Sequence, residues 1–91
     1  MKVFRIPLAL ACCAIALTAC GSVEGDVCNR ADECNALAAG LSAKECAEKT
    51  MKCTGSLTSA DRADWNTLTG NCLKLQSCTN FVSCVNAVPN C

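Results

Sequence analysis

Cysteine is the residue type through which this chain could do most chemistry, with eleven cysteines among 91 residues. A thiol can ligate a metal, exchange electrons, accept a lipid or form a disulfide. Structural zinc sites usually place cysteines two to four residues apart, and thioredoxin-like redox sites leave two residues between them. From Cys28 onward the closest cysteines are separated by five residues, and the chain has no histidine. The spacing therefore argues against a metal or redox site and predicts structural disulfides formed in an oxidising compartment.

The N-terminus has the three parts of an export signal. Lys2 and Arg5 supply positive charge, residues 6–17 form an uncharged and mostly apolar run, and small residues follow. That run falls short of the roughly 20 residues that a membrane-spanning helix needs. We therefore expect residues 1–19 to be a signal peptide that is removed together with Cys12 and Cys13.

The segment Leu17-Thr18-Ala19-Cys20 closes this signal and resembles the lipobox of bacterial lipoproteins. The resemblance implies that a lipid is attached to the sulfur of Cys20 and that cleavage leaves Cys20 as the first residue. Several acyl chains would then anchor the protein stably. Gly21 in place of aspartate implies sorting to the outer membrane of a Gram-negative cell. The expected location is the cell envelope, with the membrane as a partner through the lipid on Cys20.

Ordinary secretion is the alternative, with cleavage after Ala14-Ile15-Ala16 and an extracellular product that keeps Cys20 as one cysteine of the fold. The number of cysteines speaks against it, because Cys20 would make nine in the mature chain and leave one thiol over. A lipidated Cys20 leaves an even number for disulfides. The eight predicted disulfide cysteines are Cys28, Cys34, Cys46, Cys53, Cys72, Cys78, Cys84 and Cys91.

Beyond the signal peptide, the pattern of caps and apolar residues predicts a tether and one helical domain. Residues 20–25 are small and polar enough for a short flexible tether, and residues 26–91 form the cysteine-rich domain. Asp26 is expected to cap a first helix over 27–39, with Gly40 as its left-handed stop. Ser42 begins a capping box for a second helix that reaches about residue 53.

Two further helices complete the expected domain. Residues 58–61 open a third helix, on which Trp65, Leu68, Cys72 and Leu75 form one apolar stripe with Trp65 as the core anchor. Gly70-Asn71 is a point at which this helix could divide. A last helix begins near residue 79 or 80 and ends before Pro89. No segment alternates as a strand does, so the predicted fold is all-α: a small disulfide-stapled bundle of three to five short helices arranged as hairpins.

The expected turn at Gly40 suggests how some cysteines could pair, although the sequence cannot decide among 105 connectivities. Cys34 and Cys46 are equally distant from Gly40, and Cys28 and Cys53 nearly so. An antiparallel hairpin would therefore pair Cys34 with Cys46 and Cys28 with Cys53. The other four could nest as Cys78–Cys84 within Cys72–Cys91, and disulfides between the hairpins remain open.

Composition argues against two large function classes. The chain from Cys20 to Cys91 has six basic and eight acidic side chains, a net charge of −2, and so lacks the basic stripe of a nucleic-acid-binding protein. Without histidine the commonest general base is missing, and no phosphate loop, nucleophile elbow or metal-binding helix motif is present. We expect no enzyme activity, cofactor or metal. Asp61 and Asp64 suit the start of a helix, and Ser42 and Lys44 suit a cap and a solvated face.

The chain from Cys20 onward resembles, through short helices with paired cysteines such as NCLKLQSCTNFVSCVNAVPNC, the small cysteine-rich helical lipoproteins of some Gram-negative bacteria. Most of these have no known function, so the resemblance implies no active residue. The leading hypothesis is a membrane-tethered helical module with a binding or surface-structural role. The alternative is a freely secreted cysteine-rich signal, inhibitor or toxin-like peptide. Neither names a protein or envelope partner.

Overall fold

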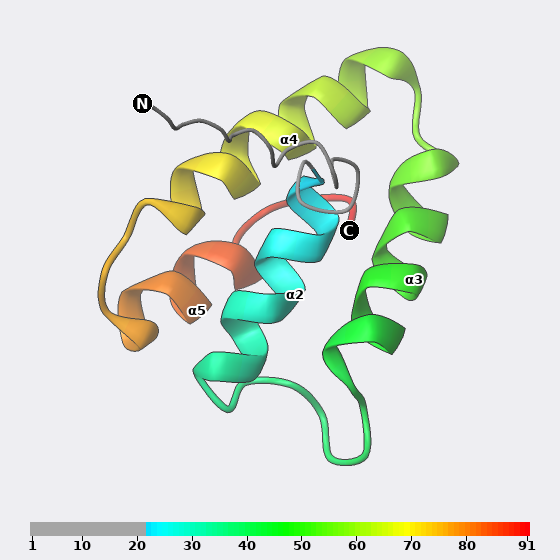
Figure 1. Cartoon of the computed structure of the whole chain (residues 1–91). Helices are drawn as coiled ribbons and strands as arrows, with labels where there is room; N and C mark the ends of the chain where they lie inside the picture. Colours follow the sequence, from blue (N-terminus) through cyan, green and yellow to red (C-terminus); the bar gives the residue numbers. More distant parts are fainter. Residues whose placement is uncertain (1–21) are drawn as a thin grey trace, which may run out of the picture.

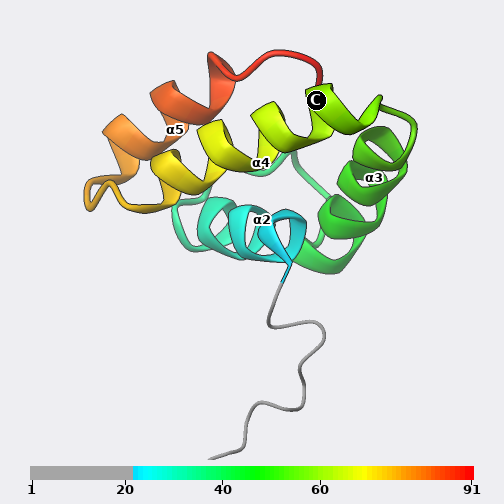
Figure 2. The ribbon, with the colours of Figure 1, turned by 90° about the horizontal axis from the view of Figure 1, so that it is seen from above.

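Residues 22–91, the part of the chain that the computed structural model describes, form four α-helices and no β-strand. These are α2 (Val23–Glu33), α3 (Ala43–Gly55), α4 (Ser59–Leu73) and α5 (Cys78–Asn86). Helix α2 packs against α3 and α4, and α5 packs against α4. In Figure 1, α2 and α3 lie side by side, and Figure 2 shows α4 between α2 and α5. The predicted all-α, disulfide-stapled bundle is confirmed.

Each of these four helices begins at a serine or threonine whose side-chain oxygen accepts a hydrogen bond from a backbone N–H of the first turn. The hydroxyls of Ser22 and Ser42 accept from the N–H groups of residues 25 and 45, and those of Thr58 and Ser77 from residues 61 and 80. Such caps satisfy amides that have no partner within the helix. The predicted starts at Ser42 and Thr58 are therefore confirmed, and α5 begins one or two residues earlier than predicted.

The start of α3 is a complete capping box. The Ser42 hydroxyl accepts from the Glu45 N–H at 3.1 Å, and a Glu45 carboxylate oxygen accepts in return from the Ser42 N–H, also at 3.1 Å. The hydrogen bonds from the Ser42 backbone and hydroxyl, helped by the charge of Lys49, lower the pKa of this exposed carboxyl below its ordinary value. Because the pKa of Glu45 is lowered in the folded state, its ionised carboxylate stabilises the fold. This stabilisation is present above the ordinary carboxyl pKa and is lost as the pH falls through the lowered pKa.

Helix α2 differs from the prediction at both ends. It begins at Val23, not after Asp26, so residues 23–25 belong to the helix and the predicted 20–25 tether is wrong for them. Ser22 caps the helix, and the burial of Glu24 ties its first turn to the bundle. The helix ends at Glu33 because the chain turns through a positive φ at Asn35; Gly40 also has a positive φ but lies inside a loop, seven residues beyond the helix.

The core is small and partly made of sulfur. Its fully buried apolar members come from α2, α4 and α5, and half-buried aliphatic side chains surround them. They are Val27, Cys28, Trp65, Cys72 and Phe81. Trp65 has 3% of its surface exposed, so its predicted place in the core is confirmed.

The predicted stripe on the third helix is only partly correct. Leu68 is 41% and Leu75 37% exposed, and Thr69 takes the inward position beside Trp65 and Cys72. Gly70-Asn71 does not divide α4, which runs on to Leu73.

Arg30 of α2 closes the C-terminal end of α4. Its guanidinium donates hydrogen bonds to the carbonyl oxygens of Leu73 at 3.4 Å, Leu75 at 2.7 Å and Gln76 at 2.9 Å. The same group lies 4.9 Å from the centroid of the Phe81 ring. The guanidinium satisfies carbonyl oxygens at and just beyond the end of α4. Its positive charge is also stabilised by the negative end of the helix dipole and by the face of the Phe81 ring. One side chain therefore joins α2, α4 and α5.

We expect Arg30→Lys to lower the free energy of unfolding by about 1–2 kcal/mol, because an ammonium group cannot reproduce the planar, multiply donating guanidinium. Urea unfolding followed by circular dichroism would measure this change. Arg62→Lys is the matched control, since the half-exposed Arg62 only approaches Glu24 at 3.7 Å. Equal losses in the two variants would contradict the role given to Arg30.

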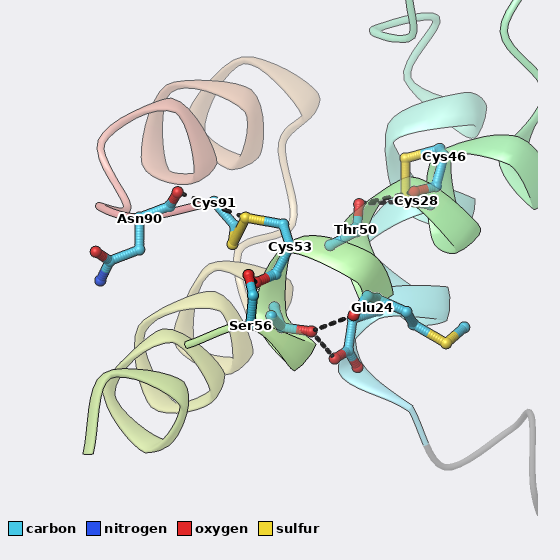
Figure 3. Close-up of a disulfide and its surroundings, with 10 residues drawn as sticks. Glu24, Cys28, Cys46, Thr50, Cys53, Ser56, Asn90 and Cys91 are labelled. Carbon is cyan, nitrogen blue, oxygen red and sulfur yellow. Dashed lines mark hydrogen bonds between the residues drawn. A yellow bond between two sulfur atoms is a disulfide. The ribbon is translucent and has the colours of Figure 1, made fainter. Parts of the chain in front are cut away.

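A buried polar contact ties the N-terminus of α2 to α3. The Thr54 hydroxyl, on a fully buried residue, donates to the Glu24 carboxylate at 2.7 Å, and Arg62 lies on the solvent side of that carboxylate. Figure 3 shows Glu24 reaching from α2 toward α3. Thr69, which is equally buried on α4, has no hydrogen-bond partner for its hydroxyl among the described residues. Thr54 and Thr69 are therefore equally buried, but only the Thr54 hydroxyl has a hydrogen-bond partner among the described residues.

This difference predicts opposite outcomes for one substitution. Thr54→Val removes a satisfied donor and should lower the free energy of unfolding by about 1–2 kcal/mol, because the buried Glu24 carboxylate loses a partner. Thr69→Val removes an unsatisfied buried hydroxyl and should leave stability unchanged or raise it. Chemical denaturation of the two variants would check this, and a larger loss at residue 69 than at residue 54 would contradict it.

Candidate functional site

The eight cysteines of the described chain form four disulfides, each of which joins different elements. Cys28 of α2 binds Cys46 of α3, and Cys72 of α4 binds Cys84 of α5. Cys34, just after α2, binds Cys78 at the start of α5, and Cys53 of α3 binds Cys91. Figure 3 shows the Cys28–Cys46 and Cys53–Cys91 disulfides at separate points along α3. Sulfur thus cross-links all four helices and the segment that follows α5.

The predicted pairing of Cys34 with Cys46 and of Cys28 with Cys53 is wrong. It assumed a tight hairpin centred on Gly40, but residues 34–42 form an irregular loop between α2 and α3. Counting residues away from Gly40 therefore does not identify the residues that face each other. Cys34 lies at the C-terminal end of α2, where it meets α5.

The predicted nest of Cys78–Cys84 within Cys72–Cys91 is also wrong. Cys78 and Cys84 lie on one helix, α5. Six residues of α-helix span about 9 Å, which exceeds the Cα separation that a disulfide tolerates. Helix α5 and this nest could not both form, and the helix is what the chain adopts.

A concave pocket opens on the face where α2, α3 and α5 meet the loop after α2. Its volume is about 220 Å³, and Trp65 of α4 also reaches it. We call it the central pocket; its main lining residues are Val27, Leu37, Trp65, Phe81, Val82 and Val85. The aromatic residues and Val27 are almost fully buried, whereas Leu37, Val82 and Val85 are half-exposed. The pocket is therefore an apolar hollow with an aromatic floor and an accessible aliphatic rim.

The polar side chains of the central pocket are few and uncharged. Thr50 of α3 lines it, but its hydroxyl already donates to the Cys46 carbonyl oxygen at 2.7 Å, which leaves only its lone pairs for a ligand. Asn86, exposed at the end of α5, contributes an amide. No acidic or basic side chain belongs to the lining. Chemically, the pocket can bind apolar groups and offer one or two neutral hydrogen bonds, but its side chains cannot supply general acid–base catalysis.

Three disulfides and one loop shape this pocket. The Cys28–Cys46 cystine forms part of the wall, and Cys91 brings the end of the chain to the rim, where Cys53 fixes it. Ala36 and Leu37 come from the loop, which begins at Cys34 and is fixed there to Cys78. The sequence does not predict this pocket, because irregular segments with no periodic signal build part of its rim.

The remaining predicted residues are placed as follows. Cys20 lies outside the described residues. Asp61 and Asp64 are exposed on the first turns of α4, and Lys44 is exposed next to the cap residue Ser42. Between residues 22 and 91, no group of three or more histidine, cysteine or acidic side chains could hold a metal ion. None of the four helices is long and apolar enough to cross a membrane.

Comparisons with known proteins found no relative: no family model, no curated protein and no solved structure matches this chain.

Proposed function

We propose that the protein is a small lipoprotein held in the cell envelope through Cys20, with a binding or surface-structural role and no enzyme activity. The observation that carries the proposal is the closed pairing of the cysteines. All eight from Cys28 to Cys91 are bonded to one another, so none of them is available to Cys20. A sulfur in this position, at the end of an LTAC sequence, suits lipid attachment better than a free thiol.

The start of the helical domain bears on what such an anchor would do. Ser22, only two residues after Cys20, already caps α2. Two residues span at most about 7 Å. A lipid on Cys20 would therefore hold the domain directly against the bilayer surface, in the outer membrane if Gly21 directs sorting as the lipobox resemblance implies. A module held so closely suits the binding of molecules in or near the envelope.

The alternative is a freely secreted cysteine-rich signal, inhibitor or toxin-like peptide. Dense disulfides are common to both classes, because small exported domains have little core to stabilise them. The two proposals differ in a single atom, the Cys20 sulfur, and in the residue at which the mature chain begins.

Mass spectrometry of the mature protein from its own cells separates the two. An N-terminal Cys20 that carries acyl groups, with the protein in the membrane fraction, is the expected result. Cys20→Ser should then abolish both the acyl mass and the cleavage that follows lipid attachment. A mature chain that starts at residue 17, with an unmodified Cys20 and recovery in the medium, would overturn the proposal in favour of secretion.

A further inference from the structure

We propose that the central pocket is a binding site for one small uncharged molecule with an aromatic or branched aliphatic body of about six to nine carbon atoms. The size follows from the volume of about 220 Å³. A closed apolar cavity of about 150 Å³ already takes up benzene. The central pocket is about half as large again, so it has room for a toluene-sized group.

The lining defines the chemistry of the ligand. Trp65 and Phe81 supply a nearly dry aromatic floor, and Leu37, Val82 and Val85 supply accessible aliphatic surface above it. Because no basic side chain lines the pocket, an anion that entered would lose its hydration without a partner. A neutral ligand avoids that cost, and its one polar atom could meet the Thr50 oxygen or the Asn86 amide.

The disulfides favour a pocket that exists before the ligand arrives. Its wall contains the Cys28–Cys46 cystine, and Cys34–Cys78 and Cys53–Cys91 fix the two irregular segments that form its rim. A site whose walls are already fixed spends less binding free energy on ordering them.

The test uses the single tryptophan as the reporter. Trp65 is the only tryptophan of a chain without tyrosine. Fluorescence excited at the red edge of the tryptophan absorption band therefore comes from the pocket floor. The oxidised chain from Ser22 to Cys91, exported behind a signal peptide that is cleaved without a lipid, is used because it needs no detergent, which would compete for an apolar site. Toluene should change the emission saturably, while benzoate, of similar shape but negatively charged, should bind at least tenfold more weakly. The absence of saturation with toluene, or equal binding of benzoate, would overturn the proposal.

A matched pair of substitutions in the loop locates the binding. Ala36 and Ala39 are both exposed, but only Ala36 lines the central pocket. Ala36→Leu should fill the rim and weaken toluene binding at least tenfold, whereas Ala39→Leu should leave it unchanged. Circular dichroism checks that both variants remain folded. Val85→Ala enlarges the pocket and is a second variant whose affinity for toluene should differ from that of Ala39→Leu. Equal affinities across the three would overturn the proposal. Because Cys20 is absent throughout, the result does not depend on lipid attachment.

Discussion

Complete reduction of the four disulfides is expected to unfold residues 22–91 at room temperature. The disulfides close loops of 12, 18, 38 and 44 residues. In the chain-entropy account, the two short loops contribute about 3 kcal/mol each and the two long ones about 4 kcal/mol each. A core with five buried apolar residues cannot replace contributions of this size, since domains this small seldom gain more than a few kcal/mol from their core.

Far-ultraviolet circular dichroism of the protein with and without a phosphine reductant would measure this loss as a disappearance of helical signal. Trp65 emission should shift to the red at the same time, because the indole is buried only in the folded state. The control is the oxidised protein with the same reductant's oxide. Retention of helix and of a cooperative thermal transition after all eight thiols are free would contradict the stabilising role given to the disulfides.

The helices follow from local signals that the sequence displays openly. Ser42 with Glu45 is a capping box in sequence and in structure, and Thr58 caps α4 as its position predicts. The error at α2 has a different origin. Asp26 and Ser22 are both good caps, and the choice of Ser22 goes with the burial of Glu24 against Thr54, a residue 30 positions away. Local preference alone could not decide between them.

The disulfide pairing shows the same limit more strongly. Which cysteines meet depends on how the helices pack and on the path of the 34–42 loop, neither of which the cysteine spacing encodes. The even number of cysteines predicts complete pairing and says nothing about partners. The central pocket is equally hidden from the sequence, since its rim joins Leu37 of the loop to Val82 and Val85 of α5. The sequence therefore predicts that the cysteines form disulfides and that the chain is helical, but it does not predict the concave face that the packed helices form.

Trp65→Ala is expected to cost about 3–5 kcal/mol of unfolding free energy, the usual range for removing a buried aromatic side chain. Trp65 is 3% exposed and packs in the core with Val27 and Phe81. Loss of the indole leaves a cavity that the disulfide-linked helices cannot easily close, because their cross-links limit how far they can move together. The indole also forms part of the central pocket floor, so the damage would extend to that site.

Leu68→Ala is the informative companion, since the sequence pattern placed Leu68 and Trp65 on one stripe while the structure leaves Leu68 41% exposed. We expect it to change stability by less than about 1 kcal/mol, as for a largely exposed side chain. Urea unfolding of the two oxidised variants, followed by circular dichroism so that loss of the tryptophan does not matter, gives both values. Similar costs at residues 65 and 68 would mean that α4 buries the stripe predicted from periodicity, with Leu68 turned inward in place of Thr69.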